Sequence, residues 1–119
     1  MDPLNIEGKP VPKGRAIPIM VNGKPRMVPD SKTRTYETQV ARAWRESGLP
    51  THEGPVSVNI VLYPDHVEVA VEPLDVGKSP VRGDVDNYAK SVLDGLNTVA
   101  FKDDRQVYVL NVVKVADEH

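Results

Sequence analysis

Acidic side chains and one lysine recur at regular spacing in the run GDVDNYAKSVLDG at residues 83–95. Asp84 and Asp86 stand just before or in the first turn of a predicted helix, and Lys90 and Asp94 follow Asp86 at steps of four residues. At about 100° per residue the last three span ~80° of helix surface, so they share one face. Carboxylates and an ammonium group on one face are suited to binding a cation and a phosphate.

Two further carboxylates, Asp103 and Asp104, stand between this helix and a predicted last strand that should pack beside it. Four or five acids can therefore converge. Carboxylates about 5 Å apart repel one another by ~3 kcal/mol per pair at an effective dielectric near 20, so convergence requires a divalent cation or protonation. Oxygen ligands beside a lysine suit Mg²⁺ or Mn²⁺ acting on a phosphate.

Each of these acids also has a purely structural interpretation. Acids in a first helical turn complement the helix dipole, and Asp86 with Lys90 could be an ordinary i,i+4 pair worth ~0.2–0.5 kcal/mol. Asp103 and Asp104 could be turn residues. A calcium EF-hand loop does not fit, because Ala89 occupies the position that needs glycine. The spacing alone leaves the structural and the metal-binding interpretations open.

The composition excludes several other kinds of site. The chain has 119 residues and no cysteine, so disulfides, thiolate zinc sites, iron–sulfur clusters and a cysteine nucleophile are ruled out. This length predicts one domain over residues 1–119. No apolar run approaches the ~18 residues of a membrane span, and the N-terminus lacks the pattern of a signal peptide. We expect a cytoplasmic protein that does not enter a membrane.

Charge is divided unevenly along the chain. Residues 1–49 carry a net charge of +4 and residues 50–119 carry −6. An enzyme that acts on a polyanion needs cations to hold phosphates and carboxylates to hold a metal ion, and this division suits such an enzyme. A solvated charge distribution without a function is the alternative interpretation.

The elements that must position these residues follow from hydrophobic periodicity and turn residues. Asn22-Gly23 between two apolar runs indicates a hairpin, and the apolar spacing after Asp30 indicates an amphipathic helix. A strand–helix–strand order near the C-terminus permits a right-handed crossover. The sequence therefore predicts an α+β fold in which two helices pack on a mixed β-sheet. Its elements are a short strand at 4–7, the hairpin at 17–28, helices at 31–47 and 86–97, a mostly buried strand at 56–63, a short edge strand at 67–72 and a last strand at 106–115.

Four segments together resemble a known family. They are D-V-D-N-x-x-K-x-x-x-D-G-L at 84–96, D-D-x-Q-V at 103–107, G-K-P-V-P-K-G-R at 8–15 and T-R-T-Y-E at 33–37. The set resembles the RusA family of Holliday junction resolvases of bacteria and their phages. The resemblance covers most of the chain, and its carboxylate motif is the specific part. The sequence departs from the family in the acidic, proline-bearing segment 64–80.

The resemblance implies roles for particular residues. Asp84, Asp86 and Asp104 match the family's essential metal-binding acids, and Lys90 matches a catalytic lysine. Asp103 matches an acid with a less decisive role. RusA-like proteins are small homodimers that cut four-way DNA junctions with Mg²⁺ or Mn²⁺, introducing paired nicks. The resemblance thus predicts a metal-dependent endodeoxyribonuclease acting in DNA recombination and repair.

Other residues receive supporting roles. We expect Asn87 to orient a carboxylate or cap locally, and Asp94 either to support the metal ligands or to form a salt bridge. The phosphate contacts of DNA are expected from basic residues, with a solvated N-terminal segment as the alternative. Those residues are Lys9, Lys13, Arg15, Lys32 and Arg34. Tyr88 and Tyr108, near the expected site, receive no role.

Three other functions remain open at this stage. The chain could be a nuclease for other branched DNA, which substrate comparison would distinguish. It could be a catalytically inactive junction-binding protein, although its intact Asp and Lys set argues against that. It could also be a small regulatory module whose acids bind Mg²⁺ only structurally.

Overall fold

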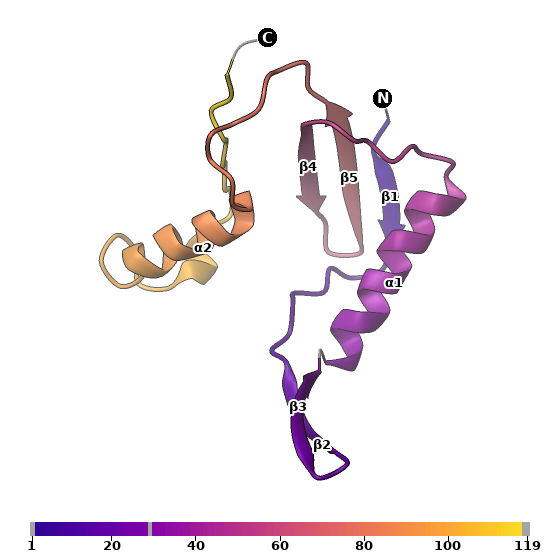
Figure 1. Cartoon of the computed structure of the whole chain (residues 1–119), viewed down its shortest axis with the longest axis vertical. Helices are drawn as coiled ribbons and strands as arrows, with labels where there is room; N and C mark the ends of the chain where they lie inside the picture. The colour runs from indigo at the N-terminus through magenta and orange to yellow at the C-terminus, as the bar shows by residue number, and fades with distance from the viewer. Residues whose placement is uncertain (1, 29, 118–119) are drawn as a thin grey trace. The chain divides into compact units, whose positions relative to one another are not determined.

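The structure is a computed structural model that describes residues 2–28 and 30–117 (Figure 1). It consists of two compact units, residues 1–74 and residues 75–119. The described residues form two α-helices and five strands, which confirms the α+β class. The basic N-terminal half of the sequence lies in the first unit, and the carboxylate motif lies in the second.

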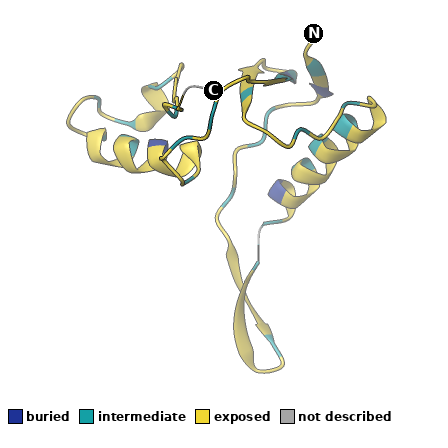
Figure 2. Ribbon diagram, turned by 45° about the horizontal axis from the view of Figure 1, so that its top comes forward, coloured by how far each residue is buried: buried dark blue, intermediate teal, exposed yellow. Residues whose placement is uncertain are grey.

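A three-stranded antiparallel sheet forms the centre of the first unit. Its order is β1 (Leu4–Glu7), β5 (His66–Pro73) and β4 (Val56–Leu62). Ile6 of β1 stands opposite Val67 of β5 in the register, and these side chains are only 2% and 4% exposed. Buried positions, drawn dark blue, are few along the ribbon in Figure 2. This apolar pair holds the N-terminal strand against the sheet.

The place of β5 in the sheet corrects the sequence analysis. The sequence predicted a short edge strand, yet β5 pairs with β1 on one side and β4 on the other. Proline is excluded from a central strand because it lacks an N–H, but Pro64 precedes β5 and Pro73 ends it. Every residue between them keeps its N–H for the ladder. The predicted buried strand, β4, lies instead at an edge of the sheet, where Ile60 is 59% exposed.

The predicted hairpin is confirmed. Strands β2 (Ile17–Val21) and β3 (Lys24–Val28) pair antiparallel. Between them Asn22 and Gly23 both have positive φ, 52° and 77°. A two-residue turn of this kind requires left-handed backbone at both positions, which asparagine and glycine adopt most readily.

The first predicted helix is also confirmed, as α1 (Ser31–Glu46). Asp30 caps it, because the backbone N–H of Thr33 donates to its carboxylate at 3.1 Å. At the other end Gly48 takes a φ of 70°, as helix C-termini often require. The helix packs along β1, where the Gln39 side-chain amide donates to the backbone carbonyl of Glu7 at 2.7 Å. This contact joins the basic helix to the sheet.

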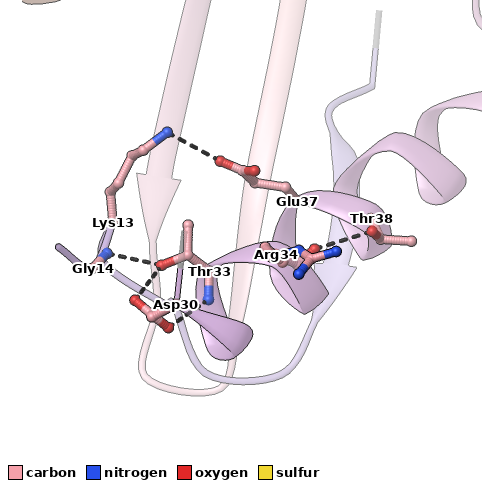
Figure 3. Close-up of polar contacts among 7 residues, drawn as sticks. All are labelled: Lys13, Gly14, Asp30, Thr33, Arg34, Glu37 and Thr38. Carbon is pink, nitrogen blue, oxygen red and sulfur yellow. Dashed lines mark hydrogen bonds and ion pairs between the residues drawn. The ribbon is translucent and has the colours of Figure 1, made fainter. Parts of the chain in front are cut away.

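The start of α1 is tied to the basic N-terminal loop by a buried threonine (Figure 3). The hydroxyl of Thr33, a residue only 4% exposed, accepts from the backbone N–H of Gly14 at 2.8 Å and donates to Asp30 at 2.8 Å. The backbone N–H of Thr33 and, after it, the Thr33 hydroxyl both donate to the Asp30 carboxylate and lower its pKa. Sequence periodicity does not identify this bridge.

The second unit contains α2 (Val85–Leu96) and a single 3₁₀ turn, Asp104–Gln106. The predicted helix at 86–97 is thus confirmed within one residue. Near the end of the chain, the backbone N–H of Gly77 donates to the carbonyl of Asp117 at 2.9 Å, and the N–H of Asp117 donates to the carbonyl of Lys78 at 3.0 Å. These bonds hold the two ends of the unit together.

The last strand expected at 106–115 is absent from the described residues, which is a second correction. Along this segment valines alternate with other side chains in the pattern typical of a strand. Tyr108, which lies between two of them, is 93% exposed. Such a pattern becomes a strand only where a neighbour supplies backbone partners. Without it no crossover forms, and the strand pairs of the described sheets are antiparallel rather than mixed. Separately, no described helix combines the length and the apolar character needed to span a membrane.

We predict that Thr33→Val lowers the free energy of unfolding by about 1–3 kcal/mol, because it leaves a part-buried N–H of Gly14 without its acceptor. Urea denaturation measures the change. Thr35→Val is the matched control, since Thr35 lies exposed on the same helix. Equal losses in both variants would contradict the structural role assigned to Thr33.

Candidate active site

Asp84 occupies the position immediately before α2 but does not cap that helix. Its backbone is extended, with φ −77° and ψ 138°, and its side chain makes no capping hydrogen bond. Asp30 stands in the equivalent position of α1, and its carboxylate accepts hydrogen bonds from the backbone N–H and the hydroxyl of Thr33. Aspartate at this position usually caps its helix. Since the Asp84 side chain does not, its exposed carboxylate is available for a ligand.

The remaining charged residues of the motif lie within α2. Asp86 lies in its first turn, and Lys90 and Asp94 follow one and two turns later on the same face. All three side chains are exposed, as is Asn87. Within the described residues, Lys90 forms no ion pair with Asp86 or with Asp94. The structure therefore does not contain the i,i+4 pair that was the structural interpretation of this spacing.

Tyr88 braces the backbone just before Asp84. Its hydroxyl accepts a hydrogen bond from the N–H of Gly83 at 3.2 Å, and its ring covers that glycine so closely that a Cβ there would lie 2.7 Å from a ring carbon. Sequence analysis assigned no role to either residue. The available signal was a glycine directly before D-x-D with an aromatic residue five positions later.

Asp103 is committed to local structure. It caps the 3₁₀ turn, accepting from the backbone N–H of Arg105 at 3.0 Å and from its guanidinium at 2.9 Å and 3.2 Å. The Gln106 side chain completes a capping box by accepting from the N–H of Asp103. The bonds from Arg105, with a smaller contribution from the Asp104 side chain, lower the pKa of Asp103 to about 2. This acid is therefore held ionised.

Asp104 is the first residue of the 3₁₀ turn and is exposed. Together with Asp84 and Asp86 it offers the carboxylate oxygens that Mg²⁺ and Mn²⁺ prefer, so the donor chemistry fits a hard divalent cation. The structure does not gather them: residues 2–28 and 30–117 contain no cluster of three or more acids or histidines that could hold a metal ion. The metal-binding assignment stays a prediction.

The basic residues expected to contact DNA lie in the first unit, apart from the carboxylate motif along the chain. Lys13 forms an ion pair with Glu37 at 3.3 Å (Figure 3). The other four are exposed and form no ion pair with the described residues: Lys9, Arg15, Lys32 and Arg34.

Comparison with protein families identifies the class to which this chain belongs. Residues 7–119 match the family described as endodeoxyribonuclease RusA, a match that includes every candidate site residue. The chain therefore belongs to the RusA family, whose members are endodeoxyribonucleases acting on Holliday junctions.

Among curated proteins, the chain is similar to the uncharacterized protein YqaN of Bacillus subtilis strain 168. The two are 32% identical over 124 residues, which cover 97% of this chain and 87% of YqaN. No solved structure matches the chain significantly.

We predict that Gly83→Ala displaces the Tyr88 ring and lowers DNA cleavage, because the new methyl group collides with the ring beside Asp84. A change in the Tyr88 ring proton shifts, measured by NMR, checks the displacement. Gly95→Ala is the control: it introduces the same methyl group within α2 where nothing lies within 4 Å. If the ring shifts are the same in wild type and Gly83→Ala, the bracing role is wrong.

We predict that the Asp103 carboxyl titrates at about pH 2 in the folded protein and that Arg105→Gln raises this value toward 3.8. Since the folded-state pKa is depressed, the stabilisation is complete above the unfolded pKa of 3.8 and is lost as pH falls toward 2. Carboxyl carbon NMR during acid titration measures both variants. An unchanged midpoint in Arg105→Gln would show that the guanidinium is not the cause.

Proposed function

We propose that this chain is a metal-dependent endodeoxyribonuclease that resolves Holliday junctions by paired phosphodiester hydrolysis in DNA recombination and repair. The family match supports the reaction class and the junction substrate. The single observation that favours catalysis over a structural role is the Asp84 carboxylate, which stands at a helix start without capping it. A protein that used this acid only for folding would gain the capping bond.

The metal ligands in this proposal are Asp84, Asp86 and Asp104, with Mg²⁺ as the cofactor and Mn²⁺ as its substitute. When bound, the ion polarises the phosphoryl oxygen and lowers the pKa of the attacking water. The carboxylates contribute fixed negative charge and oxygen ligands. Asp103, held ionised by Arg105, keeps the 3₁₀ turn in the shape that presents Asp104.

Lys90 supplies positive charge to the reaction. Its ammonium group is exposed and forms no ion pair within the described residues, so it is free to approach a phosphate. There it would stabilise the negative charge that develops on the phosphoryl oxygens during in-line attack. Asn87, in the first turn of the same helix, would orient the neighbouring carboxylates, whereas Asp94 stands two turns beyond Asp86 and takes no part in the reaction.

Binding of DNA is assigned to Lys9, Arg15, Lys32 and Arg34, with a weaker contribution from Lys13 because Glu37 already neutralises it. A homodimer would present two such sites, and two phosphate sites at a fixed separation favour a branched substrate over plain duplex. Paired nicks follow when both sites engage one junction. The proposed location is the cytoplasm, where the DNA substrate of a bacterial or phage recombination enzyme is found.

The deciding experiment is cleavage of a synthetic four-way junction with and without Mg²⁺. We predict that Asp84→Asn and Asp104→Asn each lower the cleavage rate by at least about 100-fold while leaving junction binding in EDTA nearly unchanged, since each removes a charged ligand without altering volume. Asp94→Asn makes the same chemical change on α2 outside the assigned ligands and should retain most activity.

Comparison of substrates separates the proposal from its alternatives. Cleavage of flaps or nicked duplex at rates equal to the junction would indicate a nuclease for other branched DNA. Junction binding by wild type without Mg²⁺-dependent cutting would indicate an inactive binding protein. Full activity of Asp84→Asn would contradict the site itself.

A further inference from the structure

Helix α1 carries three arginines on the side opposite its apolar stripe. At about 100° per residue, Arg34, Arg42 and Arg45 fall within ~80° of one another. Tyr36 and Val40, which are half-buried, project from the other side. The sequence assigns Arg34 to DNA contact through its position in the basic N-terminal half, and it leaves Arg42 and Arg45 open between a solvated face and a phosphate-facing one.

The surface along Arg34 and Arg42 carries two shallow, open hollows. An open hollow of about 580 Å³ follows the helix, and a second of about 270 Å³ adjoins it through shared residues. The first is lined by Ser31, Arg34, Thr35, Thr38, Gln39 and Arg42. The second shares Ser31, Thr35 and Gln39 and adds Lys32 together with Val11 and the edge of Tyr36, which mark the boundary with the apolar side of the helix. We call this the α1 polar face; it links three cationic residues through hydroxyl and amide side chains.

The two arginines of the α1 polar face are not used by the fold. Arg34 and Arg42 are exposed, and neither guanidinium forms a hydrogen bond or ion pair with the described residues. Likewise, the hydroxyl groups of Ser31 and Thr35 form no hydrogen bond within the described chain, whereas that of Thr38 donates to the backbone carbonyl of Arg34 at 3.0 Å. Two charges and two hydroxyl donors therefore remain for a ligand.

The nearby acids do not neutralise this face. Glu37 projects from a flank of α1 and pairs with Lys13 at 3.3 Å, and Asp30 is bound by Thr33. Glu46 is the last residue of the helix, beyond the lining of the hollow. The lining of both hollows contains no acidic residue. Its charge is therefore complementary to a polyanion.

We propose that the α1 polar face binds the phosphate backbone of one duplex arm of the DNA substrate, with Arg42 as a phosphate contact beside Arg34. The two arginines are eight residues apart, a rise of ~12 Å, which equals about three to four base-pair steps of the DNA axis at ~3.4 Å each. Hydroxyl and guanidinium donors are the groups that commonly position a protein on phosphate oxygens. This inference rests on the proposed action on DNA and adds a contact residue to it.

The test measures DNA binding by fluorescence anisotropy in EDTA, with a four-way junction and a duplex of the same arm sequence, over a range of salt concentrations. Arg42→Gln should weaken binding to both DNAs by about 5–10-fold and reduce the slope of log K against log salt by ~0.9, the value for one lost phosphate contact. Arg42→Lys should retain the wild-type slope, because it keeps the charge.

Arg26→Gln is the matched control, since Arg26 is an exposed arginine of the same unit that lies on β3 outside the hollows. It makes the same charge change and should alter affinity by less than twofold. Equal effects of Arg42→Gln and Arg26→Gln, or an unchanged salt slope in Arg42→Gln, would overturn the inference. A wild type that binds DNA but does not cut it, with Arg42→Gln still weakened selectively, would refute the proposed nuclease activity and uphold the binding face.

Discussion

Hydrogen bonding decides which carboxylates of this chain are structural and which are free for a ligand. Asp30 and Asp103 both precede a helical element and both accept hydrogen bonds from the backbone that follows them. Both have a lowered pKa as a result, through Thr33 in one case and chiefly through Arg105 in the other. Asp84 holds the same kind of position without making the bond. An acid that stabilises its own helix has its lone pairs already engaged, whereas the Asp84 carboxylate keeps them for a ligand.

The same division applies to the cations. Lys13 is paired with Glu37, and Arg105 is paired with Asp103, so each serves a contact within the chain. The guanidiniums of Arg34 and Arg42 and the ammonium of Lys90 have no such partner among the described residues. The unpaired guanidiniums of the basic first unit are suited to contact the phosphate backbone of DNA. The unpaired ammonium of Lys90, on the same helix as Asp86, is suited to contact the reacting phosphate. The chain belongs to the RusA family of endodeoxyribonucleases, whose substrate is a polyanion.

Local elements of the fold were predictable because their signals are local. The Asn22-Gly23 turn requires two left-handed residues in succession, and α1 follows from the apolar spacing after its cap. The strand pairings were less predictable. The status of β5 as a central strand depends on having partners on both edges, and a β-branched pattern is the same for edge and centre. The valine-rich segment after residue 106 has the pattern without the partner, so it forms no strand in the described chain.

The sequence by itself determined the chemical inventory of this protein: oxygen ligands without thiols, the Asp-x-Asp and Asp-Asp spacings, and the lysine that follows one turn later. These depend on residue type and on helix periodicity, both of which are read directly from the chain. Only the tertiary structure decided which of those groups are engaged. Whether Thr33 bridges to Gly14 depends on contacts between segments far apart in the chain, and whether Tyr88 covers Gly83 depends on backbone geometry at the start of α2 that the glycine–aromatic spacing alone does not fix.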